Sequence, residues 1–97
     1  MKSIVQDEKE CYCCGSQRNL EIHHIFFGKN RKLSDVHGLM VYLCPQCHRG
    51  TDGVHGKNGK ELNERLKREG QRKFEERYSR YTFMNIFGQN YIGGKYE

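Results

Sequence analysis

Apolar residues gather in two short segments of the first half of the chain, and both segments predict β-strands. Residues 19 to 26 include LEIHHIF, and residues 39 to 43 read LMVYL; both are rich in the β-branched and aromatic residues that strands favour. The intervening residues 28 to 38, GKNRKLSDVHG, are polar and bounded by glycines, which predicts a loop. We therefore expect two strands joined by a basic loop.

A four-residue apolar repeat predicts a long helix from about residue 58 to about residue 80. The repeat consists of Leu62, Leu66, Phe74 and Tyr78. Asn58 is a candidate N-cap, and Gly70 occupies the step at which the repeat lacks an apolar side chain. Because a four-residue repeat drifts around a helix of 3.6 residues per turn, Gly70 is expected to mark a close contact, a bend or a break into two helices.

The flanking segments carry weaker patterns. Residues 1 to 10 are charged and aperiodic and are expected to form a flexible, frayed lead-in. Glycines punctuate residues 48 to 59, HRGTDGVHGKNG, and limit any helix there to about one turn. The apolar tail, residues 81 to 94, is expected to pack back as a short helix ending at Gly88. Its apolar residues Phe83, Ile86 and Phe87 favour the core of a monomer, with a dimer face as the alternative.

The composition indicates one small domain that needs additional stabilisation. The chain has 97 residues and is 35% hydrophobic, which leaves little material for a large core. It has no long apolar run of the kind that spans a membrane, and its N-terminus lacks the apolar segment of a signal peptide. We therefore expect a cytoplasmic protein without membrane contact, in which cysteines remain reduced.

Four of the five cysteines form two pairs with the same spacing. Cys11 and Cys14, and likewise Cys44 and Cys47, read C-x2-C. Two residues between thiolates allow a tight turn to direct both sulfurs at one tetrahedral ion. Two matched pairs in a cytoplasmic chain argue against a redox motif or a disulfide, so we predict a structural Zn²⁺ site. Cys13 is either a spare thiol or a competitor of Cys14 for the metal.

The charge balance favours a polyanionic partner. The formal net charge is +5 and the pI is about 9.0. Residues 57 to 80 contain nine Lys or Arg against five Glu, a mixture that is more simply a solvated helix face. The predicted loop between the strands, with Lys29, Arg31 and Lys32, is the stronger candidate for contact with the phosphates of a DNA backbone.

Four histidines are expected near the zinc fold. His23 and His24 are adjacent in the first strand, so their side chains point to opposite faces and are suited to different roles. His48 directly follows Cys47, and His55 lies among glycines seven residues later. The zinc would tie the first strand to the turn that carries His48, which brings the histidines together.

The segment from Cys11 to about His55 resembles the HNH endonucleases of the His-Me finger (ββα-metal) class, and small phage-type HNH proteins in particular. It has a C-x2-C knuckle, a strand ending in a doublet whose second member is His, and a second strand that runs into LC-x2-CH. The resemblance implies an α+β fold with a zinc-stabilised core over residues 11 to 56. Residues 57 to 97 would form a helical extension packed on the same domain. For a phage protein, the location would be the cytoplasm of the bacterial host.

The resemblance also implies roles for the histidines. His24 would be the general base, and His23 and His48 would hold a catalytic divalent ion, Mg²⁺, Mn²⁺ or Zn²⁺. His55 is the preferred third ligand because its glycine-flanked segment can fold back, and Asp52 is the alternative.

One family position differs in this chain. Leu39 stands where the family has an Asn that orients the base, so His37 or a backbone carbonyl would have to take over. Arg49, beside His48, is a further candidate for phosphate contact.

These expectations lead to a metal-dependent endonuclease that nicks or cuts DNA with little sequence specificity, guided by DNA structure or by a recruiting protein. The alternative is a noncatalytic zinc-binding module for DNA or RNA, which Leu39 at the Asn position supports.

Overall fold

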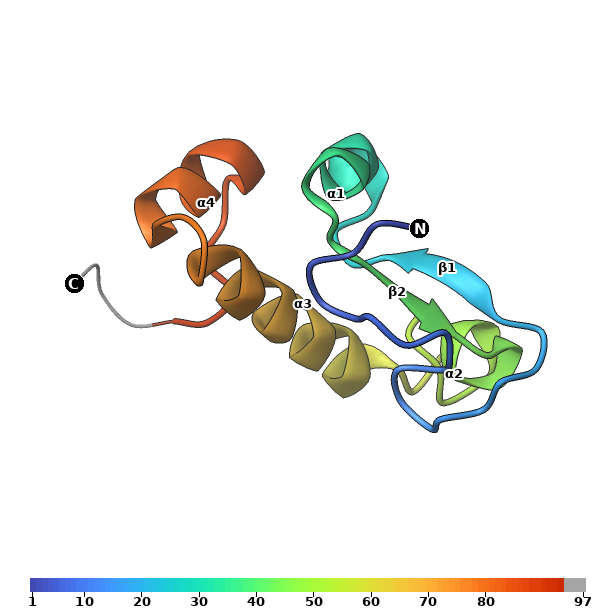
Figure 1. Cartoon of the computed structure of the whole chain (residues 1–97). Helices are drawn as coiled ribbons and strands as arrows, with labels where there is room; N and C mark the ends of the chain where they lie inside the picture. Colours follow the sequence, from blue (N-terminus) through green and yellow to red (C-terminus); the bar gives the residue numbers. More distant parts are fainter. Residues whose placement is uncertain (94–97) are drawn as a thin grey trace.

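Two short antiparallel strands lie at the centre of an α+β fold, with helices on either side (Figure 1). The computed structural model describes residues 1 to 93. Strand β1 spans Glu21–His24 and strand β2 spans Met40–Leu43, in a register that pairs His23 with Val41. Both residues of this pair are buried, whereas the preceding Ile22 is 46% exposed. The two predicted strands are confirmed, each shorter than predicted, and burial alternates from Ile22 to His23 in β1.

The predicted loop between the strands is wrong, because residues 28 to 37 are helical. The short 3-10 helix η1 spans Gly28–Asn30 and helix α1 spans Arg31–His37. The buried hydroxyl of Ser34 donates to the backbone oxygen of Phe26 at 2.6 Å and accepts from the Phe26 amide at 3.0 Å. A polar side chain therefore anchors α1 to the end of β1, and an apolar pattern does not reveal such a contact.

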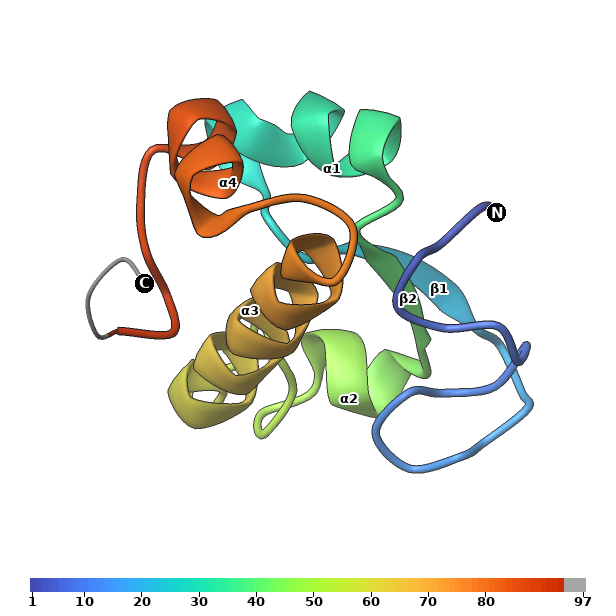
Figure 2. The ribbon, with the colours of Figure 1, turned by 60° about the vertical axis from the view of Figure 1, so that its left-hand side comes forward.

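The N-terminal segment lies along the outer edge of β2, which differs from the expected frayed lead-in (Figures 1 and 2). The amide of Ile4 donates to the oxygen of Gly38 at 2.9 Å. The buried side chain of Gln6 accepts from the amide of Tyr42 at 2.8 Å and donates to the oxygen of Glu10 at 2.6 Å. The bond to Tyr42 satisfies a backbone amide that the edge of β2 would otherwise expose.

Helix α2 spans Pro45–Arg49 and leads into a series of glycine turns over residues 50 to 59. Each of three successive glycines donates its amide to the oxygen of the glycine three residues earlier, at 2.8 to 3.1 Å. The turns pack so closely that a Cβ added at Gly56 would lie 1.9 Å from the oxygen of Gly50. The segment is compact because these positions lack side chains.

Helix α3 spans Lys60–Glu75, shorter at both ends than predicted. Its N-cap is Gly59 rather than Asn58, whose side-chain amide instead donates to Asp52 at 2.9 Å. The helix ends before Tyr78, which is 56% exposed and lies outside the buried face.

Gly70 marks a close contact within α3, one of the three outcomes predicted for it. The helix continues through this residue without a break. A Cβ added at Gly70 would lie 3.2 Å from a methyl group of Ile25 and 3.3 Å from the ring of Phe26. The missing side chain thus lets α3 approach the segment that follows β1.

Helix α4 spans Arg80–Phe87 and closes the core, as predicted for the tail. Ser79 caps it by accepting from the amide of Thr82, and Gly88 ends it. The buried rings of Phe83 and Phe87 pack at 5.4 and 4.8 Å from Phe26, and Ile86 packs against the same core. Within residues 1 to 93, no helix combines the length and apolar character needed to cross a bilayer.

Candidate metal centre and histidine site

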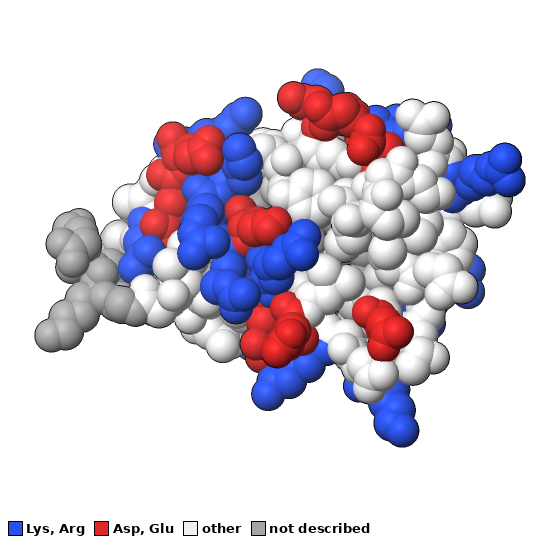
Figure 3. All heavy atoms as spheres, turned by 90° about the horizontal axis from the view of Figure 1, so that it is seen from below, with Lys and Arg blue, Asp and Glu red and all other residues white. Residues whose placement is uncertain are grey.

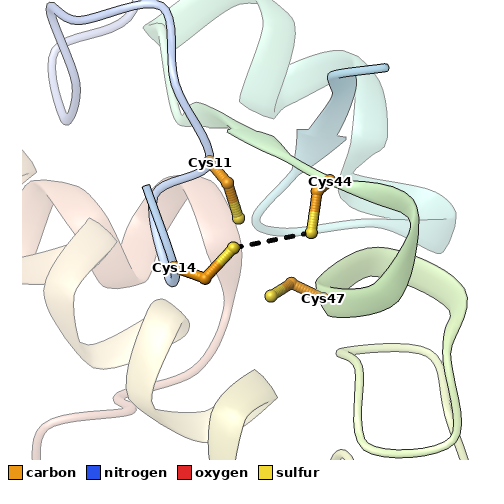
Figure 4. A group of neighbouring side chains, drawn as sticks. All are labelled: Cys11, Cys14, Cys44 and Cys47. Atoms are coloured by element: carbon orange, nitrogen blue, oxygen red, sulfur yellow. Dashed lines mark hydrogen bonds between the residues drawn. The ribbon is translucent and has the colours of Figure 1, made fainter. Parts of the chain in front are cut away.

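The thiols of four cysteines converge between the N-terminal loop and the end of β2 (Figure 4). Cys11 and Cys14 come from the loop before β1, Cys44 directly follows β2, and Cys47 lies on α2. Their sulfur atoms all lie within 4.8 Å of one another, and those of Cys14 and Cys44 are 3.7 Å apart. All five cysteines of the chain are free thiols.

This cluster fits a structural metal ion such as Zn²⁺. Four sulfurs at this spacing match the donor set and number of a closed tetrahedral site. Burial tends to raise the pKa of Cys11, but backbone amides that hydrogen-bond its sulfur outweigh this effect and lower the pKa to about 6. Cys13 lies outside the cluster, where burial raises its pKa to about 11. The structure therefore places Cys14, and not Cys13, in the cluster.

A second cluster brings together the histidines of three elements. His23 from β1, His48 from α2 and His55 from the glycine turns each offer one ring nitrogen, all within 4.8 Å of one another. Nε2 of His23 is buried and has no hydrogen-bond partner among the described residues. Burial, followed by the charges of His48 and His55, lowers the pKa of His23 to about 3. His23 is therefore neutral at physiological pH, the form in which imidazole binds a metal.

Glu21 and Arg49 hold His48 in place. Nδ1 of His48 donates to Glu21 at 2.7 Å, which leaves Nε2 directed away from Glu21 and available as a ligand. Arg49 donates to both oxygens of the same carboxylate, at 2.6 Å to one of them. Hydrogen bonds from Arg49 and His48 lower the pKa of Glu21 to about 2. The Arg49 side chain stays 65% exposed beside this ion pair, so its predicted phosphate contact remains a prediction. Sequence reasoning missed Glu21.

The glycine turns direct His55 to the cluster. Its amide donates to the backbone oxygen of His48 at 3.0 Å, and the amide of Val54 donates to that of Cys47 at 2.8 Å. Asp52 lies outside the cluster, and its carboxylate accepts from the side chain of Asn58. The preference for His55 over Asp52 agrees with this arrangement.

His24 has a partner that sequence reasoning also missed. Its Nε2 lies 2.9 Å from a carboxylate oxygen of Asp35, which comes from α1. His37, which with a backbone carbonyl was one of two groups expected to orient His24, instead packs its ring 5.6 Å from Phe74 and 6.0 Å from Phe87. The pairing of Asp35 with His24 could not be predicted, because the segment that carries Asp35 was expected to be a loop.

Both members of the histidine doublet line one hollow. It has a volume of about 220 Å³ and is lined by Ile22, His23, His24, Phe27, Arg31, His48 and His55. Of the three basic residues predicted between the strands, only Arg31 lines it. Lys29 and Lys32 are exposed on the neighbouring surface of η1 and α1. We call this hollow the histidine site.

Comparisons of the chain with protein-family models, with curated proteins and with solved structures gave no significant match.

The buried His23 makes the stability of the fold depend on pH. Its pKa is about 3 in the folded chain against 6.5 for a free imidazole, so between these values the unfolded chain binds more protons. The contribution of neutral His23 to the free energy of unfolding is therefore fully present above pH 6.5. It is lost as the pH falls towards 3. The loss from His23 is at most about 1.4 kcal/mol per pH unit.

Urea unfolding of the wild type and of His23→Leu at several pH values tests this expectation, with no divalent ion added. Because both proteins share the four cysteines, the difference between their unfolding free energies isolates His23. We expect the wild type to lose stability faster than the variant below pH 6.5. Parallel pH curves would contradict the role given to His23.

Proposed function

We propose that the protein is an HNH-type endonuclease of the His-Me finger class, which hydrolyses phosphodiester bonds of DNA. One observation carries the proposal: the buried, unpartnered Nε2 of His23 faces two further imidazoles, in the same hollow as His24 with its Asp35 partner. A buried polar atom without a partner is costly, and a bound cation would satisfy it. The doublet ends β1, which pairs with β2, and α2 follows β2 directly; this order supports the proposed ββα-metal class.

The residues present fit two metal ions with different roles. The four cysteines suit a structural Zn²⁺. His23, His48 and His55 would hold the catalytic divalent ion, and the hydrogen bond from His48 to Glu21 is the kind of contact that orients a ligating histidine. Such an ion, when bound, stabilises negative charge on the scissile phosphate and the leaving oxygen.

His24 is the general base in this proposal. Donation from its Nε2 to Asp35 leaves Nδ1 free to accept a proton from the attacking water. The carboxylate fixes this tautomer and favours the imidazolium that forms when the proton moves. Arg31, which lines the same hollow, offers a guanidinium to the phosphate.

A noncatalytic zinc-binding module for DNA or RNA is the second candidate. Its main support is Leu39 at the family's Asn position, and this residue is fully buried in the core. The contact between His24 and Asp35 weakens that support, because it supplies from α1 the orienting group that Leu39 lacks.

A plasmid-cleavage assay tests the proposed function. The purified protein is incubated with supercoiled DNA and Mg²⁺, Mn²⁺ or Zn²⁺, and with a chelator as the control. We expect nicked or linear product only with a divalent ion present. Binding without cleavage of supercoiled, linear or single-stranded DNA under every metal would favour the noncatalytic module instead.

Replacing Asp35 with asparagine is expected to slow cleavage by about 10- to 100-fold, the usual effect of losing an orienting partner. The slowing is expected because the amide of asparagine no longer accepts as a carboxylate from the His24 ring and so holds its tautomer less firmly. Asp7→Asn, at an exposed position of the N-terminal segment, is the matched control. An unchanged cleavage rate in folded Asp35→Asn would remove Asp35 from the site.

A further inference from the structure

A second hollow lies along the N-terminal half of α3, on the side where the chain returns from α4. Its volume is about 500 Å³, and the segment 89 to 91 forms its other wall. The charged residues that line it are Lys60, Glu64, Lys67 and Arg68, so cations outnumber the single carboxylate. We call it the α3 groove.

The far wall of this groove is held by a buried side chain. Gln71 of α3 is fully buried; it accepts from the amide of Tyr91 at 2.7 Å and donates to the side chain of Asn90 at 3.0 Å. Figure 2 shows the returning segment, coloured red, descending from α4 beside α3. The groove is thus a fixed feature of the fold.

The α3 groove adjoins the histidine site through one lysine and one ring. Nζ of Lys67 lies 4.7 Å from the ring centre of Phe27 and 5.4 Å from that of Tyr91. The Phe27 ring lines the histidine site and packs 5.1 Å from the ring of His55. Lys67 therefore stands between the two hollows, with an aromatic ring from each beside it.

The cations of the groove differ in whether a carboxylate pairs with them. Lys60 lies 4.0 Å from the carboxylate of Glu64, which also attracts Lys67 from a longer distance. Elsewhere on α3, Arg65 pairs with Glu69 at 3.4 Å and Lys73 with Glu76 at 3.5 Å. Figure 3 shows a face on which Lys and Arg side chains are interspersed with Asp and Glu. Within residues 1 to 93, neither Lys67 nor Arg68 lies within ion-pair distance of a carboxylate. Both charges are available to an anionic partner.

We propose that the α3 groove carries the DNA strand that leaves the histidine site, with Lys67 and Arg68 on its backbone phosphates. The inference rests on the proposed function, because continuity with a site for phosphodiester chemistry favours DNA over an acidic protein. It also revises the sequence-based view of this helix as a merely solvated face. Contacts of this kind position DNA without reading its sequence.

Binding measurements test the groove independently of cleavage. Fluorescence anisotropy with a short labelled DNA duplex gives Kd over a range of salt concentrations, in a His24→Ala background that leaves the DNA intact. We expect Lys67→Ala and Arg68→Ala each to reduce the slope of log Kd against log salt by about 1, the value for one lost phosphate contact. The control is Arg72→Ala, an exposed α3 residue that does not line the groove, and we expect it to leave the slope unchanged. Lys67→Arg should retain the wild-type slope.

The outcomes separate this inference from the proposed function. Unchanged slopes for correctly folded Lys67→Ala and Arg68→Ala would overturn the groove as a DNA path, even if the wild type cleaves DNA. Reduced slopes in a protein that cleaves nothing would support the groove and contradict the nuclease. Equal losses in Arg72→Ala would indicate a diffuse charge effect and overturn the inference. Unchanged slopes for the Lys67 and Arg68 variants, together with binding of polyglutamate by the wild type, would also overturn the inference. That result would indicate an acidic protein as the partner of the groove.

Discussion

Replacing His24 with alanine is expected to slow DNA cleavage by about 100- to 10,000-fold, the usual contribution of a positioned general base. The imidazole of His24 pairs with Asp35 of α1. It lies outside the cluster of His23, His48 and His55. Its loss should leave the divalent-ion ligands intact. The rate of plasmid nicking, measured with saturating divalent ion, gives the effect.

His37→Ala is the matched control for this experiment. It removes an imidazole that packs on Phe74 and Phe87, away from the histidine site. We expect its cleavage rate to stay within a few-fold of the wild type, provided that thermal melting shows it folded. Equal rates for His24→Ala and the wild type would exclude His24 as the base, and a large loss in folded His37→Ala would restore the role predicted for it from the sequence.

Replacing Cys44 with alanine is expected to abolish tightly bound zinc and most of the cooperative folding transition. The cluster joins the loop that carries Cys11 to the end of β2 and the start of α2, and a domain this small has few other contacts to replace it. A structural zinc contributes on the order of 10 kcal/mol, comparable to the whole stability of a small domain. Zinc content after dialysis and thermal melting by circular dichroism measure the two losses.

Cys13→Ala is the comparison that makes this test specific. The two variants remove the same group, but Cys13 lies outside the four-sulfur cluster. We expect Cys13→Ala to retain the zinc content of the wild type and a similar melting transition. A folded Cys44→Ala that is insensitive to chelator would mean that no metal supports the fold. Loss of zinc in Cys13→Ala would mean that this residue, rather than Cys14, is the ligand.

Features that depend on spacing or local pattern could be predicted from the sequence. The matched C-x2-C pairs specify which sulfurs can share a centre, and the structure brings those four together. The strands, the tail helix and the convergence of His23 and His48 follow from apolar patterning and from the position of His48 next to a cysteine knuckle.

Features that depend on single polar contacts could not be predicted. Helix α1 buries only one residue, Ser34, and turns Leu33 and His37 partly inward, so it lacks the apolar stripe by which a helix is recognised. Asp35 contacts His24 only because α1 is helical, so this pairing could not be predicted from a segment expected to be a loop. The role of Glu21 likewise depends on a single contact, with His48, which lies 27 positions away in the chain.

The glycine turns over residues 50 to 59 limit how this protein can vary. Since each third position lies against backbone, side chains there are excluded, and an inserted residue would shift His55 out of phase with His48. Adaptation in the segment is therefore confined to its exposed positions, such as Thr51 and Lys57. Any related chain that keeps the histidine site by the same construction should keep the length of this segment, its three-residue glycine period, His55 and the buried Val54, while exposed positions such as Thr51 and Lys57 vary.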